Sequence, residues 1–594
     1  MKKTLCLLLA LLMLGSMLAG CASTPAEPSN TTDNTQQAND SQTSNSTSDQ
    51  PAENPQNDDK TADESETPGN TAIAPTESGS IMSDSNSAYD MWNKGAPLNF
   101  AKNVANYPAN TAYPLTSEPT TLTCWMGWSS YLAGNTLESP NDSPAFQAAC
   151  EKTGVNIEFT LANDVATQFP LLLASEEYTD MYINGGSDRL SVYADDEIIL
   201  DITDVIPTYA PNYQALRMDD ADFARRSKTD DGRMLAMFGV HTLGGLTWLA
   251  GMTRLDWLGD RDPITYDDIY EVLVSYRDEF HCPSPLTIAE NGQETFFMAG
   301  YNVGTSWIVV DGEVRHSVLE EGYRSYLEMM NKWYSEKLID QNFYGRGFVG
   351  FDFDYLTGGE TGMFSSAYQF MNVAEAFSSD PDFTLVGVRC PVQKEGDKRL
   401  IELSANRSRY MDDAYVAFFN GCSNLELAVS FCDFWFSPEG GMLKAYGIEN
   451  DGYYYDENGT PLLTDEILYP EDPTQSINVV RNQKTADYFP GLLDWTRDQK
   501  GGMSEHALEA PQKWDYNWVD TISFPNVTRT LEEGERYAFL MSDIETRINE
   551  TVLHFITGEK SMDEWDSFLD ELKSMGLEEA RQIQQQAYDR FMAR

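Results

Sequence analysis

The side chains that most often catalyse reactions or bind metals form no recognisable pattern in this sequence. Its histidines are His241, His281, His316, His506 and His554, and no two share a helical face at metal-binding spacing. The motifs His-Glu-x-x-His and Gly-x-Ser-x-Gly and a phosphate-binding loop are absent. Two carboxylates can hydrolyse a glycoside, but a chain with 94 acidic residues always offers such pairs. The sequence therefore predicts a protein that is not an enzyme and holds no metal or cofactor.

Aromatic and hydrogen-bonding side chains offer a different chemistry, the binding of a polar ring. Trp125 and Trp128 end one apolar run, with Ser129 beside them, and Asn184 and Asp188 follow another. Flat aromatic faces combined with fixed donors and acceptors suit a sugar, which has apolar ring faces and a hydroxyl rim. Packing in the core is the alternative interpretation for each tryptophan.

The remaining candidates are more scattered along the chain. Arg254 is a further source of polar contacts. Core packing is the interpretation we favour for the tryptophans in helical patterns, which are Trp257, Trp333 and Trp435. Trp514 and Trp518 stay open between the core and a binding site.

A parallel sheet would bring the first group of candidates together. Apolar and alternating patterns predict strands at 121–126, 155–159 and 180–183, with helices at 143–152 and 167–174 between them. Strands alternating with helices form a mostly parallel sheet, and such sheets bind ligands beyond the carboxyl ends of their strands. We therefore expect the loops after Met126 and Ile183 to form one site.

The amino terminus carries an export signal. Met1-Lys2-Lys3 precedes an apolar run from Leu5 to Met17, which is short for a membrane span. The sequence that follows, Leu18-Ala19-Gly20-Cys21, resembles the lipobox of bacterial lipoproteins. That resemblance implies a signal peptide at 1–20 and a lipid on Cys21, which would hold the protein on the extracytoplasmic face of the cell membrane. An ordinary signal peptide with an incidental cysteine, or an uncleaved anchor, would fit the same residues.

A polar segment separates Cys21 from the folded part. Residues 22–88 are rich in Ser, Thr, Asn, Gln, Pro and acidic residues, and lack the apolar surface needed to fold. We expect a disordered tether over 21–114, with a root-mean-square reach of roughly 50 Å. The formal net charge of −54 argues against nucleic acid as a partner.

Six cysteines lie in the predicted folded part. They are Cys124, Cys150, Cys282, Cys390, Cys422 and Cys432, and none forms a Cys-x-x-Cys pair. Export permits disulfides, but a chain of this length can build a core without them. Buried free thiols are the favoured interpretation.

Six short sequence segments, taken in order, resemble segments of the extracellular solute-binding proteins of ABC importers, in the large branch related to maltose-type binding proteins. They begin at Leu173-Ala174-Ser175, Arg254-Leu255-Asp256-Trp257-Leu258, Met329-Met330-Asn331-Lys332-Trp333-Tyr334, Gly359-Glu360-Thr361-Gly362-Met363, Phe434-Trp435-Phe436-Ser437-Pro438-Glu439-Gly440 and Phe555-Ile556-Thr557-Gly558. The resemblance covers about 120–592. Some family members carry a calcium loop after the helix at 265–280; here His281-Cys282-Pro283-Ser284-Pro285 lacks the necessary carboxylates.

The resemblance implies an α/β fold of the type II periplasmic-binding-protein class, with two lobes, a hinge, a cleft between the lobes and extra C-terminal helices. It implies one lobe from 115–241 and 361–411, and another from 242–360 and 412–594. It also implies that Trp248, Tyr368 and Gln369 lie where the chain passes between lobes, and so near the ligand.

The implied function is to capture an oligosaccharide or other carbohydrate and deliver it to the permease subunits of an ABC importer, acting as a monomer. A peptide or other polar solute is the first alternative ligand. A secreted glycan-degrading enzyme is the second possibility, and a surface adhesin without a transporter is the third.

Overall fold

The computed structural model describes residues 112–594, apart from 129–136, 186–188, 242–246, 404–409, 458, 470–476, 495–496, 498–502 and 520–521. The predicted signal peptide with Cys21, nearly all of the tether, and the candidates Ser129 and Asp188 lie outside the described residues. Within the described part, no helix has both the length and the apolar character needed to cross a membrane.

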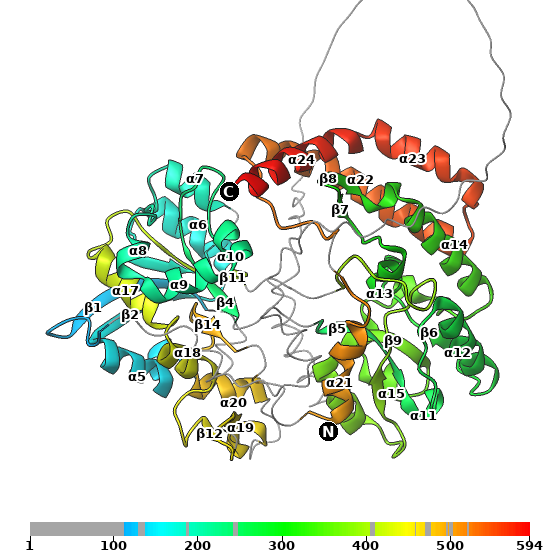
Figure 1. The fold of residues 1–594 in the computed structure, drawn as a ribbon, viewed down its shortest axis with the longest axis horizontal. Coiled ribbons are helices and arrows are strands. Elements are labelled where there is room, and N and C mark those ends of the chain that lie inside the picture. The colour runs from blue at the N-terminus through cyan, green and yellow to red at the C-terminus, as the bar shows by residue number, and fades with distance from the viewer. Residues whose placement is uncertain are drawn as a thin grey trace, which may run out of the picture.

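Two separate apolar cores define two lobes, which lie side by side in Figure 1. The core of lobe 1 comes from residues 122–240 and 410–493, and that of lobe 2 from residues 250–403 and 507–583. Trp435 in lobe 1 and Trp333 in lobe 2 are fully buried, as their helical patterns predicted. Trp514 is also a core residue, and its indole N–H donates to the Gly251 carbonyl at 2.7 Å.

Lobe 1 is built on a six-stranded sheet with the order β14-β4-β11-β3-β1-β2. β1 pairs in parallel with both β2 and β3, whereas β11 runs antiparallel to its neighbours β3 and β4. The bounds are β1 (Thr120–Gly127), β2 (Val155–Ala162), β3 (Met181–Ile183), β4 (Met237–His241), β11 (Tyr410–Phe418) and β14 (Leu492–Leu493). A small hairpin adds β12 (Tyr453–Tyr455) and β13 (Pro461–Leu463).

Capping residues set the ends of the lobe 1 helices, as α5 shows. In α5, the Ser143 hydroxyl caps the amino end, Pro144 starts the first turn and Gly154 ends the helix at a φ of 74°. The predicted alternation of strands and helices over 121–183 is therefore confirmed. The helices are α5 (Pro144–Thr153), α6 (Val165–Ser175), α7 (Leu190–Asp195), α8 (Ile206–Tyr209), α9 (Pro211–Asp219), α10 (Ala221–Arg226), α17 (Leu425–Phe434), α18 (Pro438–Ala445), α19 (Asp465–Leu468) and α20 (Ile477–Lys484).

Lobe 2 has a four-stranded sheet with the order β10-β5-β9-β6, and a separate hairpin of β7 and β8. The strands are β5 (Leu249–Arg254), β6 (Ser284–Leu286), β7 (Trp307–Val310), β8 (Glu313–His316), β9 (Thr361–Ala367) and β10 (Leu385–Gly387). The first helices are α11 (Leu255–Leu258), α12 (Tyr266–Asp278), α13 (Thr295–Met298), α14 (Glu321–Ser335), α15 (Phe353–Thr357) and α16 (Met371–Phe377). Thr265 caps α12 in a reciprocal capping box with Asp268.

The predicted additional C-terminal helices are present and belong mainly to lobe 2. They follow α21 (Glu505–Trp514) and are α22 (Leu531–Thr557), α23 (Trp565–Ser574) and α24 (Leu577–Ala593). α22 packs along α14 and buries Ile544, Ile548, Val552 and Phe555 at helical spacing. The chain therefore ends in a helical layer that covers lobe 2 in Figure 1.

The expected division of the chain between the lobes is wrong in two places. β9 lies in the lobe 2 sheet, because it pairs with β5 and β6, and residues 361–403 stay with lobe 2. β11 and the segment up to residue 493 complete lobe 1 instead of lobe 2. The first crossing lies between β4 and β5, as expected. The second lies between Leu403 and Tyr410, and the third between Leu493 and Ala507.

The packing of Gly362 shows why β9 belongs to lobe 2. A Cβ at Gly362 would lie 2.4 Å from the ring of Tyr276 in α12, so the strand is fitted closely against that helix. All seven residues of β9 are buried. A short strand buried on both faces fits either sheet by its apolar pattern alone, and the partner is decided by this tertiary contact.

The cysteines of the described part are free. Four of them are buried and two are partly exposed, in agreement with the prediction of free thiols. Burial raises the pKa of Cys282 and Cys390 to about 11, which keeps both as neutral thiols at ordinary pH.

His316 makes the stability of lobe 2 depend on pH. Its ring packs edge-on against Trp307 at 4.8 Å, and its Nδ1 accepts the Val318 N–H at 3.3 Å. Full burial lowers the pKa of His316 to about 4. Because this pKa lies below the unfolded value of about 6.5, the unfolded chain takes up the proton first as the pH falls, and stability is lost between about pH 6.5 and 4.

We expect this one group to lower the free energy of unfolding by about 2 kcal/mol between pH 7 and 4.5. His316→Gln keeps an acceptor but does not titrate, so its pH dependence should be flatter by that amount. Urea titrations at the two pH values measure the difference. Equal pH dependence in the two proteins would contradict the assignment.

Candidate functional site

The carboxyl ends of β1 and β3 bring three predicted site residues to one edge of the lobe 1 sheet. Met126 is the register partner of Ile183, so Trp128 and Asn184 follow neighbouring strand ends. A Cβ on Gly127 would lie 3.2 Å from the Asn184 carbonyl oxygen, which shows how closely the two ends pack. The chain segments that leave Met126 and Ile183 therefore lie side by side in their described residues.

The two tryptophans at this edge are mostly buried. Trp125 packs against Phe169 with ring centroids 5.0 Å apart, and Trp128 packs edge-on against Tyr488 at 5.3 Å. Each has a relative exposure of 3%. The indole rings are therefore fixed in orientation, and both belong to the lobe 1 core, as the core-packing interpretation holds.

Asn184 is held by β11. Its Oδ1 accepts the Tyr415 N–H at 3.2 Å, and its own N–H donates to the Tyr415 carbonyl at 3.4 Å. The β11–β4 register shifts between Met411 and Tyr415, so Asn184 supplies an acceptor where the ladder is irregular. Its left-handed backbone, with a φ of 57°, suits an asparagine. Asn184 thus positions the sheet edge, and its side-chain amide N–H groups are the part left for a ligand.

This edge of lobe 1 is the one from which the chain passes to lobe 2. β3 and β4 both run antiparallel to β11, and β14 runs parallel to β4. The carboxyl ends of β1, β3, β4 and β14 and the amino end of β11 therefore share one edge. All three crossings start or finish there, so this edge of the sheet is directed towards lobe 2.

The predicted residues of lobe 2 lie on the corresponding edge of its own sheet. Leu249 pairs with Ala367, and the Tyr368 N–H donates to the Trp248 carbonyl at 3.0 Å. Trp248 and Gln369 are half-buried, and Tyr368 is buried. The first crossing enters lobe 2 here, so Trp248, Tyr368 and Gln369 lie on the edge that is directed towards lobe 1.

Two further features mark this edge. The Thr247 hydroxyl donates to Asp515 Oδ1 at 2.7 Å, and both residues are buried. The bond ties the start of β5 to the end of α21, and so joins the chain just after the first crossing to the chain beyond the third. Among the described residues, no group hydrogen-bonds to the buried Oε1 of Gln369. Such an acceptor costs about 1–3 kcal/mol when unsatisfied, so it favours a partner that brings a donor.

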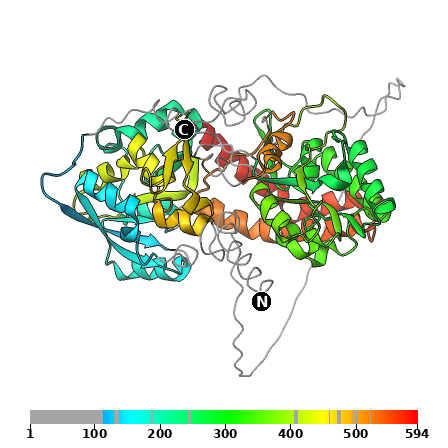
Figure 2. The same ribbon diagram turned by 90° about the horizontal axis from the view of Figure 1, so that it is seen from below.

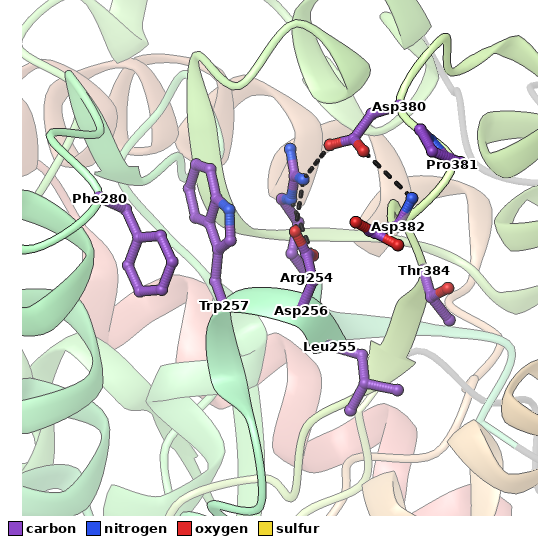
Figure 3. A pocket seen from close by; sticks show the side chains of 9 residues that line it. All are labelled: Arg254, Leu255, Asp256, Trp257, Phe280, Asp380, Pro381, Asp382 and Thr384. Atoms are coloured by element: carbon purple, nitrogen blue, oxygen red, sulfur yellow. Dashed lines mark hydrogen bonds and ion pairs between the residues drawn. The ribbon is translucent and has the colours of Figure 1, made fainter.

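Arg254 does not join this group. It ends β5, about 17 Å along the strand from Leu249 at the usual rise per residue. Figure 3 shows it in a separate open pocket of about 630 Å³. The lining residues are Arg254, Leu255, Asp256, Trp257, Phe280, Asp380, Pro381, Asp382 and Thr384.

The side chains that line this pocket stack on one another and bond to one another. The Arg254 guanidinium lies over Trp257 at 4.4 Å and over Phe383 at 4.9 Å, and Phe280 stacks on Trp257 at 5.1 Å. Asp256 accepts two hydrogen bonds from Arg254, at 3.0 and 2.6 Å, and Asp380 accepts one at 2.9 Å. Both faces of Trp257 are covered, so this pocket offers a ligand no free indole face. Arg254 has a structural role, which corrects its prediction as a ligand contact.

Comparison with known proteins identifies the fold. No family model matches the chain. A curated relative, the fructooligosaccharide ABC transporter substrate-binding protein FusA of Streptococcus pneumoniae serotype 4, is 21% identical over 497 residues, which span 77% of this chain and 88% of the relative. The crystal structure of the alginate-binding protein AlgQ2 without calcium ion matches 81% of this chain and 100% of that chain, with a TM-score of 0.60 and 21% identity. This is the fold of an ABC-importer solute-binding protein.

A second solved structure has the same two-lobed fold. It is the human-milk-oligosaccharide (HMO) binding, ABC-transporter-associated solute-binding protein from Bifidobacterium longum infantis. It covers 80% of this chain and 99% of its own, with a TM-score of 0.64 and 15% identity. The resemblance expected from the sequence phrases, and the α/β solute-binding fold that it implied, are confirmed.

The solute-binding fold also reveals residues that sequence patterns missed. Tyr488 packs against Trp128, and Tyr415 is bonded to Asn184, so both contribute to the lobe 1 edge. Tyr415 is set by the irregular β11–β4 register, which no sequence pattern marked. Tyr488 comes just before β14, a two-residue strand too short to predict. Among the described residues, no three His, Cys, Asp or Glu side chains converge as a metal site would require.

Proposed function

We propose that this protein captures an oligosaccharide between its two lobes and delivers it to the permease of an ABC importer. The observation that carries the proposal is the pair of facing sheet edges, one with Trp125, Trp128 and Asn184 and the other with Trp248, Tyr368 and Gln369. The names of the relatives support the ligand class, since they include binders of fructooligosaccharide, alginate and human milk oligosaccharides. Ser129 and Asp188 belong to the proposed site.

Binding would proceed by closure of the lobes around the sugar. Three chain crossings form the hinge between two separately packed cores. Only the closed form contacts the ligand from both sides, so ligand shifts the population towards it. Closure changes the surface shared by the two lobes, and a permease can recognise that change. None of this requires bond-breaking chemistry, which is consistent with a transport protein and not an enzyme.

A glycan panel tests the proposal directly. Calorimetry and thermal shift are run with fructooligosaccharides, uronate oligomers, milk oligosaccharides and N-glycan fragments, and with peptides as the comparison class. A true ligand at 100 times its Kd should stabilise the protein by about 2.7 kcal/mol and raise its melting temperature by a few degrees. Binding of peptides and of no sugar would reject the carbohydrate assignment.

We further propose that Cys21 carries a lipid that anchors the protein to the membrane and that residues 22–114 are a flexible tether. The lipobox-like Leu18-Ala19-Gly20-Cys21 and the composition of the tether support this. A tether of this length keeps the lobes near the permease at high effective concentration, so modest docking affinity suffices. Cys21→Ser should release folded protein into the medium, measured by cell fractionation. Retention of the variant on membranes would reject the anchor.

A further inference from the structure

We propose that the carboxyl end of α24 is a clamp that ties lobe 1 to lobe 2 and limits the separation of the lobes. The clamp consists of Arg590 and Phe591 from α24, of Arg594 directly after the helix, and of Asp230 from lobe 1. Among the residues that the structure describes, it links the lobes through side chains, in addition to the three chain crossings. The inference rests on the two-lobed fold and does not depend on the identity of the ligand.

The first part of α24 is fixed to lobe 2. Leu577 and Ala580 are buried in the lobe 2 core. Further along, Gln585 accepts the Val314 N–H at 2.7 Å and donates to the Gly312 carbonyl at 3.0 Å, so its amide is bonded twice to the turn and the start of β8. The helix therefore leaves lobe 2 in a fixed direction.

The last turns of α24 contact lobe 1. Arg590 Nε donates to Asp230 Oδ2 at 2.7 Å, and Arg594 donates to Asp230 Oδ1 through Nε at 2.9 Å and Nη2 at 2.6 Å. Arg594 Nη1 also donates to the Lys228 carbonyl at 2.6 Å. Figure 2 shows α24 lying between the two lobes, with the chain terminus at lobe 1.

An aromatic contact accompanies the ion pairs. Phe591 is fully buried, and the guanidinium groups of Arg225 and Arg226 in α10 lie 5.5 and 5.7 Å from its ring centre. Arg594 lies over the same ring at 5.3 Å. Val527 and Ala587 complete the small apolar cluster around Phe591. An apolar side chain under three cations is shielded from water, and it strengthens the clamp when salt screens the ion pairs.

The charges of the clamp are balanced and its lobe 1 half is rigid. Arg590 is also paired with Glu533 of α22, which gives the alternating series Glu533, Arg590, Asp230, Arg594. Asp230 projects from a tight turn in which the Thr229 N–H donates to the Arg233 carbonyl at 2.9 Å and Gly232 has a φ of 87°. A rigid turn held against a rigid helix end resists sliding, so the lobes must rotate about this contact when they open or close.

The test measures lobe separation in the ligand-free protein. Spin labels are placed at Leu171→Cys on α6 and Phe539→Cys on α22, which are 64% and 69% exposed and lie in different lobes. Cys150 and Cys422, the partly exposed thiols, are replaced by serine. Asp230→Arg sets three like charges against each other and should broaden the distance distribution about twofold, whereas Asp230→Arg with Arg594→Asp should narrow it again.

Glu579→Gln is the matched control. It breaks the Arg536–Glu579 ion pair between α22 and α24, which has comparable geometry, at 2.6 and 2.7 Å, but lies inside lobe 2. The control should leave the distribution unchanged. A folded Asp230→Arg protein with a distribution as narrow as the wild type, or one that the second change does not narrow, overturns the proposal.

A milder double variant allows the same measurement if Asp230→Arg does not fold. Asp230→Asn with Arg594→Gln removes charge without adding repulsion, and the same broadening relative to Glu579→Gln is expected. An unchanged width in this variant also overturns the proposal. Failure of the glycan panel would not affect these measurements, because they are made without ligand.

Discussion

Trp248→Ala should weaken carbohydrate binding by about 30-fold, equivalent to about 2 kcal/mol, without unfolding the protein. Trp248 is the half-buried aromatic residue at the lobe 2 edge, held in place by the bond from the Tyr368 N–H to its carbonyl. A backbone contact survives the substitution, so the edge should persist while the aromatic face is lost. Calorimetry with the best sugar from the panel measures the change in Kd.

Phe280→Ala is the control for this prediction. Phe280 is a 39% exposed aromatic residue of the same lobe, but it stacks on Trp257 in the Arg254 pocket. Its removal should leave the Kd within twofold of the wild-type value. Equal losses of affinity in the two variants would show that binding responds to lobe 2 stability and not to contact with Trp248.

Asp487→Asn should lower the free energy of unfolding by about 3 kcal/mol or more at pH 7. Asp487 Oδ2 lies 2.5 Å from Arg497 Nη2 and 3.6 Å from Arg481 Nη2, and its Oδ1 lies 3.6 Å from Lys444 Nζ. All three cations are buried. Asparagine nearly keeps the shape of the side chain but removes the negative charge that these three cations share.

The same cluster predicts a sensitivity to acid. Burial alone would raise the pKa of Asp487, but Arg497, Lys444 and Arg481 outweigh it and hold the pKa well below its usual range. Because the folded pKa is depressed, the stabilisation is present above about pH 4, the unfolded value, and is lost as the pH falls further. Asp487→Asn should therefore be less acid-sensitive than the wild type, as well as less stable at pH 7.

Asp451→Asn is the control for the cluster. Asp451 pairs with Lys484 at 2.7 Å in the same lobe, but its side chain is 44% exposed. Surface pairs contribute about 0–1 kcal/mol. Urea unfolding followed by circular dichroism should separate the two variants by about 2 kcal/mol or more. Similar midpoints for both would mean that the Asp487 cluster is not a buried network.

Local structure could be predicted from the sequence because local signals specify it. Ser143, Pro144 and Gly154 mark both ends of α5, and Thr265 and Asp268 mark the start of α12. The division into lobes could not be predicted, because it depends on which sheet accepts β9 and β11. Those choices are made by contacts such as Gly362 with Tyr276, between residues far apart in the chain.

The candidate site was predictable where it followed from strand direction. Trp128 and Asn184 meet because parallel strands end at one edge. Arg254 does not lie with the other candidates, because it ends the same strand that Trp248 precedes and the length of β5 separates the two residues. Residue type alone could not distinguish a guanidinium available to a sugar from one already bound by Asp256 and Asp380 and covered by Trp257.

The position of β11 in the middle of the lobe 1 sheet determines when the strands of that sheet can pair during synthesis. β3 and β4 lack their shared neighbour β11 until residues 410–418 have been synthesised. β14, the other neighbour of β4, is synthesised later still. During synthesis, the first half of lobe 1 therefore carries unpaired strand edges, which are prone to associate with other chains. The sheet of lobe 1 is completed only after the first segment of lobe 2, residues 250–403, has been synthesised, and before the C-terminal helices of lobe 2 follow.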